Sequence, residues 1–172
     1  MHDQLFTFDP GLRCSGIAYF EAGELKWASL AYPGHDERPR DVDGALRMAE
    51  EVVDILPGRL KLKSCSLDSR LVYEKPQIYK TRDVRPDDVM QLAYVNGAVG
   101  ALLNIDRTEG VFAREWKGQI PKDVTHRRVR AELSDDETEL IDSLESRFQK
   151  SLFHNLMDAV AIGMSDLERV LL

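Results

Sequence analysis

The amino-acid sequence predicts an α/β fold, in which a five-stranded mixed sheet of three antiparallel and two parallel strands is flanked by helices. Three short runs of β-favouring residues, separated by glycine-containing turns, open the chain and are typical of an antiparallel meander. After residue 69, extended and helical segments alternate, which favours right-handed parallel crossovers. These two observations together predict helices packed against a mixed sheet.

The meander is predicted at residues 5–8, 15–20 and 25–31. Its first strand ends at Asp9-Pro10-Gly11, a strong turn sequence, and Ala22-Gly23 separates the other two strands. Residues 32–40 are polar and carry two prolines and a glycine, so we expect a loop there.

The remaining elements follow from apolar spacing. Short apolar runs predict two parallel strands, at 69–74 and 110–113. Helical spacing predicts helices at 41–56, 87–103, 121–133 and 135–148, and from about 152 to the C-terminus. Asp87 or Asp88 can cap the helix at 87–103. The buried stripe expected on that helix is Val89, Leu92, Ala93, Val95, Val99 and Leu102. The stripe expected on the last helix is Leu156, Val160, Met164, Leu167 and Leu171.

Length and composition are those of an ordinary globular protein. The 172 residues suit one domain spanning 1–172, with 43% hydrophobic and 31% charged residues. No apolar run approaches the roughly 18 residues that a membrane span requires, and the N-terminus lacks the features of a secretory signal. Cys14 and Cys65 fit no metal-ligand spacing, and we expect reduced thiols in a cytoplasmic protein.

The formal net charge of −7 weighs against binding to a phosphate backbone, which usually needs a basic surface. Basic residues are nevertheless concentrated at 114–130, a stretch that contains six lysines and arginines and only two acidic residues. A metal-dependent nuclease also needs a carboxylate cluster, which bound cations screen. The charge therefore does not exclude nucleic acid as a partner.

Three acidic residues have positions that point to chemistry. Asp9 and Glu74 each end a predicted strand, and the carboxyl ends of neighbouring parallel strands open into one crevice. Asp158 lies within an apolar stretch of the last helix, where an isolated carboxylate is costly unless it is paired. Each acid alone could be a residue without a catalytic role, in a turn, at a strand end or on a helix surface. Together they predict a site for Mg²⁺ or Mn²⁺, and two such ions about 3.5–4 Å apart suit phosphodiester hydrolysis.

Four segments resemble a known family. FTFDPGLRCSGIAYF resembles the opening hairpin of RuvC-type Holliday-junction resolvases, LVYEKP their strand ending in a catalytic glutamate, and HNLMDAVAIGM their final helix. EWKGQIPK is similar to an insert of phage-encoded relatives. The resemblance implies an RNase H-like fold, a homodimer, Mg²⁺ or Mn²⁺, and paired nicks across branched DNA.

The resemblance also implies roles for individual residues. Asp9, Glu74 and Asp158 match the metal ligands of the family, whereas Asn155 stands where the family usually has an acid or histidine. His154 lies four residues before Asp158, on the same helical face. Either residue could complete the site: His154 as a ligand or proton carrier, Asn155 through its carbonyl oxygen. A structural hydrogen bond is the alternative for His154.

The basic region supplies candidates for DNA binding. Lys117, Lys122, Arg127 and Arg128 could hold phosphates near the scissile bond, or form the solvated face of an amphipathic helix. Trp116 is expected to be a packing residue.

The segment after Glu74 supplies further candidates for DNA binding. Tyr79, Lys80 and Arg82 place an aromatic between cations. The resemblance implies that an aromatic in this region wedges into the junction, where Tyr79 could stack on a base.

Small residues are dense in the helix at 87–103, which contains Ala93, Gly97, Ala98, Gly100 and Ala101. Glycine costs a helix about 1 kcal/mol relative to alanine, so a close helix approach is the expected compensation. The close approach could be to another element of the same chain. The resemblance implies a two-fold dimer at this helix.

Other functions remain open at this stage. An RNase H-like nuclease acting on RNA, or a non-catalytic nucleic-acid-binding module, would share the fold. Actin-like ATPases and sugar kinases also begin with a strand, an aspartate and a glycine turn. They normally need two such domains and a second phosphate loop, which this chain lacks.

Overall fold

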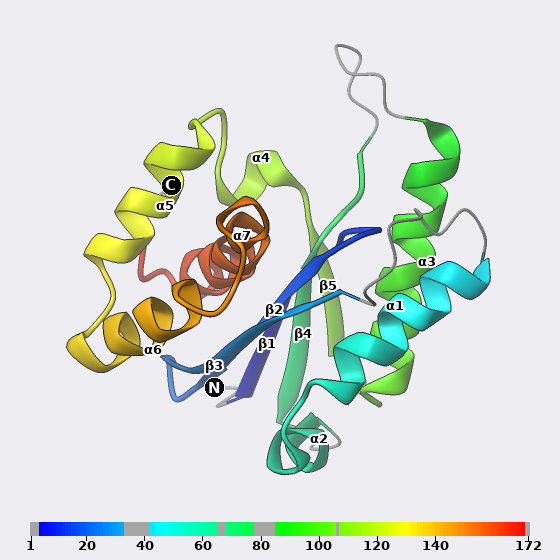
Figure 1. Cartoon of the computed structure of the whole chain (residues 1–172), viewed down its shortest axis with the longest axis horizontal. Helices are drawn as coiled ribbons and strands as arrows, with labels where there is room; N and C mark the ends of the chain where they lie inside the picture. Colours follow the sequence, from blue (N-terminus) through cyan, green and yellow to red (C-terminus); the bar gives the residue numbers. More distant parts are fainter. Residues whose placement is uncertain (1–3, 33–41, 65–67, 78–84, 106, 171–172) are drawn as a thin grey trace.

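A five-stranded mixed sheet in the order β3-β2-β1-β4-β5 runs through the middle of the molecule in the computed structural model (Figure 1). The structure describes residues 4–32, 42–64, 68–77, 85–105 and 107–170. The strands are β1 (Gln4–Asp9), β2 (Ser15–Glu21), β3 (Glu24–Ala31), β4 (Ser69–Glu74) and β5 (Arg107–Val111). β1, β2 and β3 pair antiparallel, and β4 joins β1 and β5 in parallel. The predicted fold class is confirmed.

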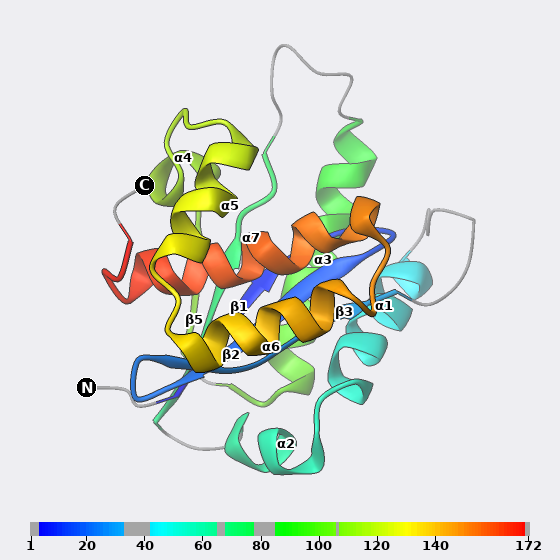
Figure 2. The same cartoon turned by 60° about the vertical axis from the view of Figure 1, so that its left-hand side comes forward.

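Helices cover both faces of the sheet (Figures 1 and 2). The helices are α1 (Val42–Asp54), α2 (Gly58–Ser64), α3 (Pro86–Leu102), α4 (Ala113–Trp116), α5 (Lys122–Ala131), α6 (Asp135–Glu145) and α7 (Lys150–Asp166). α1 and α3 pack together on one face. On the other face α7 crosses β1 and β2, α6 lies against β3, and α5 packs onto α7. Among the described residues, no helix is long and apolar enough to cross a bilayer.

The alternation of side chains along β1 builds a core on each face. Phe6 and Phe8 join the cluster under α1 and α3, while Leu5 joins the cluster under α7. Thr7 points to the α7 side, where its hydroxyl donates a 2.7 Å hydrogen bond to the Ala159 carbonyl. This buried bond sets the position of α7 along β1, which matters for the site below.

Several predicted boundaries were wrong. The last parallel strand was expected at 110–113, but β5 covers Arg107–Val111 and Ala113 already belongs to α4. β5 is a largely exposed edge strand of sequence RTEGV, so no apolar run marks it. The short helices α2 and α4 were not predicted, because so few residues carry no clear periodicity. α7 begins at Lys150 and ends at Asp166 rather than continuing to the C-terminus.

The start of α3 also differs from the prediction. Arg85 is the N-cap and Pro86 the first helical residue, so Asp87 and Asp88 lie in the first turn. Proline suits that position because its missing N–H would have no helical partner there and its φ is already helical. The two aspartates still face the positive end of the helix dipole.

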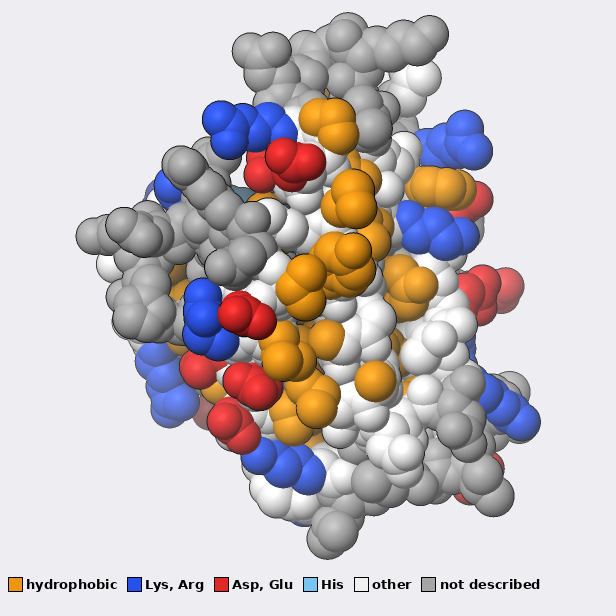
Figure 3. Space-filling view, turned by 90° about the vertical axis from the view of Figure 1, so that its right-hand side faces the viewer, with side chains coloured by type: hydrophobic (Ala, Val, Ile, Leu, Met, Phe, Trp, Pro, Cys, Tyr) orange, Lys and Arg blue, Asp and Glu red, His pale blue; other side chains and the backbone are white. Residues whose placement is uncertain are grey.

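The buried face of α3 differs from the expected stripe. Val95 and Val99 are buried as expected, but Ala93 and Leu102 are exposed. The polar or small residues Gln91, Asn96 and Gly100 are buried instead. Apolar side chains of α1 and α3 therefore remain on the outer surface (Figure 3).

Glu137 is a buried acid that the sequence did not single out. Its carboxylate accepts hydrogen bonds from the Leu25 N–H at 2.7 Å and from both terminal nitrogens of Arg169 at 2.6 Å. It also closes a capping box with Ser134 at the start of α6. Burial raises the pKa of Glu137, but the bonds from Arg169, Leu25 and Ser134 outweigh that and lower it to about 2.

Replacing Glu137 with Ala is expected to lower the free energy of unfolding by about 3 kcal/mol, because the part-buried Arg169 loses its carboxylate partner. Chemical denaturation measures this. Since the folded-state pKa is depressed, the contribution is present above about pH 4.5 and lost as the pH falls towards 2. The exposed Glu139→Ala on the same helix is the control. Equal stability of the two variants would contradict the prediction.

Candidate active site

Asp9, Glu74 and Asp158 converge at one end of the sheet. Asp9 ends β1 and Glu74 ends β4, and the parallel register that pairs Phe8 with Tyr73 places the two acids side by side. Asp158 follows from the placement of α7, because the Thr7 bond holds the residue next to it, Ala159, against β1. Three elements distant in sequence thus deliver three carboxylates to the carboxyl edge of the parallel strands.

The electrostatics of Asp9 show that the three acids share one site. Its pKa is raised well above the ordinary value by burial, and then by the charges of Asp158 and Glu74. Lys122 and Lys117 offset this only in part. The Asp9 carboxylate makes no hydrogen bond or ion pair with any other residue that the structure describes. Burial and the two neighbouring carboxylates therefore both disfavour the ionised form of Asp9, in spite of the two lysines.

Glu74 is held by the segment that contains α4. Trp116 Nε1 donates a 2.9 Å hydrogen bond to Glu74 Oε2, and Lys117 Nζ lies 3.6 Å from the same oxygen. On the other side, Asn96 Nδ2 on α3 donates to the Glu74 carbonyl at 3.3 Å. Trp116 is buried as predicted, and its N–H also serves the candidate site.

Asp158 is held in the same manner by α5. Its Oδ1 lies 2.7 Å from His126 Nε2, and its Oδ2 forms an ion pair with Lys122. The Asp158 residue is only 3% exposed. Burial raises the pKa of Asp158, but the hydrogen bond to His126 and the charge of Lys122 lower it below its ordinary value.

Asn155 and His154, the two candidates for a fourth metal ligand, have different surroundings. Asn155 Nδ2 donates a 3.1 Å hydrogen bond to the Cys14 carbonyl, which ties α7 to the turn between β1 and β2. His154 is half-buried, and its pKa is lowered by burial and by the charge of Lys122, with Asp158 acting in the opposite direction. His154 is therefore close enough to Asp158 to feel its charge, whereas the Asn155 side chain is bonded to the turn after β1.

His126 is the residue that sequence reasoning missed. It stands four positions after Lys122 in α5, so both side chains lie on one helical face. That spacing was visible in the sequence. The direction of the face was not, because it depends on how α5 packs against α7.

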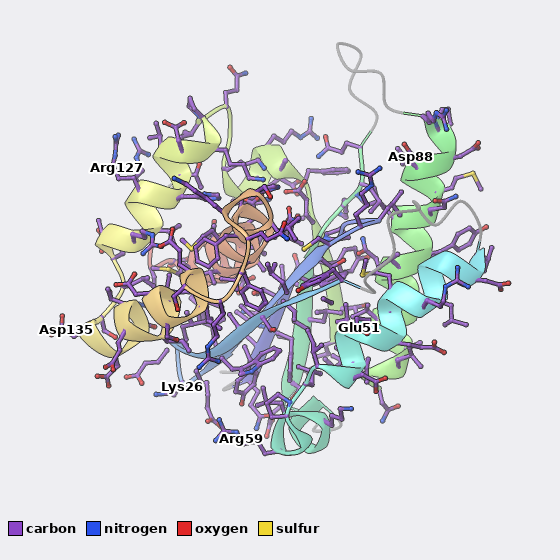
Figure 4. The ribbon with its side chains drawn as sticks, viewed as in Figure 1. Lys26, Glu51, Arg59, Asp88, Arg127 and Asp135 are labelled. Atoms are coloured by element: carbon purple, nitrogen blue, oxygen red, sulfur yellow. The ribbon has the colours of Figure 1, made fainter. Side chains whose placement is uncertain are left out.

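The other basic candidates divide into two groups. Lys117 and Lys122 contact the acids, whereas Arg127 and Arg128 are exposed on α5, with Arg127 on its side away from the sheet (Figure 4). Tyr79, Lys80 and Arg82 lie outside the described residues.

The donor set fits a hard divalent cation. Within the described ranges, no group of three or more His, Cys, Asp or Glu side chains forms a ready-made cage, since lysines pair with two of the acids. Carboxylate oxygens are nevertheless the ligands that Mg²⁺ and Mn²⁺ prefer. Burial and the neighbouring carboxylates both raise the pKa of Asp9, and a bound cation would stabilise its ionised form.

Comparison with solved structures identifies the fold. The structure of Thermus thermophilus RuvC is similar with a TM-score of 0.58 and 16% identity, covering 94% of this chain and 92% of that one. T. thermophilus RuvC in complex with a Holliday junction substrate is similar with a TM-score of 0.54 and 14% identity, covering 95% and 92%. No family model and no curated protein matches the sequence. The fold that the sequence motifs implied is confirmed.

Proposed function

We propose that this chain, which has the fold of RuvC, is a metal-dependent endonuclease that resolves Holliday junctions or other branched DNA by paired nicks. The observation that carries the proposal is the convergence of Asp9, Glu74 and Asp158 from β1, β4 and α7. One of the similar structures is a complex with a Holliday junction, which supports branched DNA as the substrate.

Each group at the site has a proposed role. Asp9, Glu74 and Asp158 hold Mg²⁺ or Mn²⁺, with two ions per site. When bound, such ions supply an activated water and stabilise the leaving oxygen of the phosphodiester. His154 lies near Asp158 with a lowered pKa, which favours a neutral imidazole that can accept a proton. Asn155 offers its amide oxygen as a further ligand.

Basic side chains around the acids would position the DNA backbone. Lys117 and Lys122 stand at the carboxylates, where their ammonium groups can reach a phosphate bound at the same place.

The exposed residues Arg127 and Arg128 extend this surface along α5. Tyr79, Lys80 and Arg82 are assigned to the junction itself, from the sequence alone.

A nicking assay tests the proposed function. The purified chain is incubated with a mobile four-way junction, a linear duplex, a flap and an RNA–DNA hybrid of matched sequence, with Mg²⁺, Mn²⁺ or a chelator. The proposal expects symmetrical nicks in the four-way junction, which the chelator abolishes. Preferential cleavage of the hybrid would identify an RNA-directed nuclease instead. Tight binding without cleavage would identify a non-catalytic module.

We also propose that the chain forms a homodimer through α3, which would place two sites for paired cuts. The small residues of α3 separate into two groups. A Cβ on Gly100 would lie 3.3 Å from Thr108 Cγ2, so close intrachain packing accounts for that glycine. A Cβ on Gly97 would meet nothing within 4 Å, and Ala93 and Ala101 beside it are exposed.

Large apolar side chains surround this exposed part of α3. They are Val42 and Leu46 of α1, and Met90, Tyr94 and Leu102 of α3, which are 41–57% exposed. Figure 3 shows hydrophobic side chains along the face on which α1 and α3 lie. A helix that combines exposed small and large apolar residues suits close packing against a second copy of itself.

Gly97→Leu is therefore expected to weaken dimerisation at least about tenfold, because the added side chain separates the two helices. Sedimentation equilibrium measures the dimer dissociation constant. Ala131→Leu, at an exposed position of α5 on the opposite face of the sheet, is the matched control. A monomeric parent chain, or a Gly97→Leu variant that associates like the control, would refute the α3 interface.

A further inference from the structure

The segment from Trp116 to His126, which we call the 116–126 segment, contacts two of the three acids with the same pair of groups. A ring N–H and a lysine reach Glu74, supplied by Trp116 and Lys117. A ring nitrogen and a lysine also reach Asp158, supplied by His126 and Lys122. Each acid thus has one rigid contact and one flexible cationic contact from a single stretch of chain.

The two kinds of contact have different consequences for the carboxylates. An indole N–H is only a donor, and a histidine nitrogen facing a carboxylate donates as well. Each ring therefore orients one carboxylate oxygen by a hydrogen bond, and the carboxylate keeps lone pairs with which it can bind a metal. The lysines are compact charges on flexible chains, and the Lys122 side chain is 43% exposed beside an Asp158 side chain that is 4% exposed. The lysine can therefore leave towards solvent while the acid stays in place.

The apolar packing of the segment is separate from these polar contacts. Within the segment, Thr125 is buried and the Trp116 ring belongs to the core cluster under α7, which also contains Val129, a residue of α5 beyond the end of the segment. Substitutions that keep the size of the ring but remove or replace the donor should therefore leave the fold intact.

We propose that Trp116 and His126 are positioning residues that orient Glu74 and Asp158, and that Lys117 and Lys122 are resident counter-cations which a divalent ion displaces. The inference rests on the proposed metal site. It assigns to His126 an outer role beside Asp158 that the sequence motifs do not indicate. Hydrogen bonds of this outer kind commonly change metal affinity by 10–100-fold when they are removed.

The two pairs should respond to substitution with opposite signs. We expect Trp116→Phe and His126→Ala to weaken Mn²⁺ binding by about tenfold or more, with partial recovery in His126→Gln, whose amide can donate from the same place. We expect Lys122→Met and Lys117→Met to tighten Mn²⁺ binding by about two- to fivefold, because the ion no longer has to break an ion pair. If the segment had only a structural role, the ring variants and the lysine variants would not change Mn²⁺ affinity in opposite directions.

Direct titration with Mn²⁺ measures these affinities without any DNA, using the electron paramagnetic resonance signal of free Mn²⁺ and the full chain. Arg127→Met controls for the loss of a positive charge on α5 away from the acids, and circular dichroism checks folding. If His126→Ala unfolds, His126→Gln and Trp116→Phe carry the comparison.

The outcomes separate this inference from the proposed function. Mn²⁺ binding by the parent chain, unchanged in the ring variants or weakened in the lysine variants, would overturn the positioning roles and leave the metal site standing. A parent chain that binds no Mn²⁺ would overturn the metal site itself, and the positioning roles with it.

Discussion

Replacing Asp9 with Asn is expected to reduce metal-dependent cleavage by about a thousandfold, since a metal contributes several kcal/mol to such a transition state. The same substitution should make the metal-free protein more stable. Burial and the charges of Asp158 and Glu74 raise the pKa of Asp9, so its ionised form costs folding free energy at neutral pH. Asparagine keeps the shape of the side chain and removes that charge.

The stability gain should depend on pH with a definite sign. Because the folded-state pKa of Asp9 is raised, its cost is complete above that pKa and falls to a small remainder by about pH 4, where the unfolded chain begins to be protonated as well. Thermal unfolding at pH 7 and pH 4, with a chelator present, measures it, at about 2–4 °C for each kcal/mol. Asp123→Asn, an exposed acid on α5, is the control.

Two results would count against this account of Asp9. Cleavage that persists in both Asp9→Asn and Asp158→Asn would remove the metal-ligand assignment. A metal-free Asp9→Asn protein that is less stable than the parent would show that the carboxylate has a structural partner, and that the acids do not repel one another as described.

Gly16→Ala should have the largest effect on stability, lowering the free energy of unfolding by about 3 kcal/mol or more. A Cβ on Gly16 would lie 2.0 Å from the Asn155 carbonyl oxygen and 2.5 Å from its carbon. These are backbone atoms of α7, so the helix itself would have to move. Because α7 carries Asp158 three residues later, catalysis should fall together with stability.

Thermal unfolding of Gly16→Ala should show a melting temperature about 6–12 °C below the parent. Gly58→Ala is the matched control, since a Cβ there meets nothing within 4 Å. A Gly16→Ala protein as stable as the control would mean that α7 does not approach β2 as closely as the structure shows.

The sheet could be predicted where local patterns were strong. β1 to β3 carry alternating apolar residues and glycine turns, and β4 is a clear apolar run, so four of the strands were predicted near their observed bounds. The predicted position of β5 was too late in the sequence, because an exposed edge strand needs no apolar face that a pattern could reveal. The outward face of α3 was partly misjudged, since burial of Asn96 depends on a partner, the Glu74 carbonyl, that lies 22 residues away in the sequence.

The sequence by itself was enough to select Asp9, Glu74 and Asp158 and to place them on their strands and helix. A strand end, a turn and an acid within an apolar helix are local features. Only the tertiary structure decided what surrounds the three acids. His126, Trp116 and the two lysines reach the acids because α4 and α5 pack against α7, and Gly97 faces outward because α3 turns its other side to α1 and the sheet. Such contacts join residues far apart in the chain, and a local pattern does not record the direction in which a helix face will point.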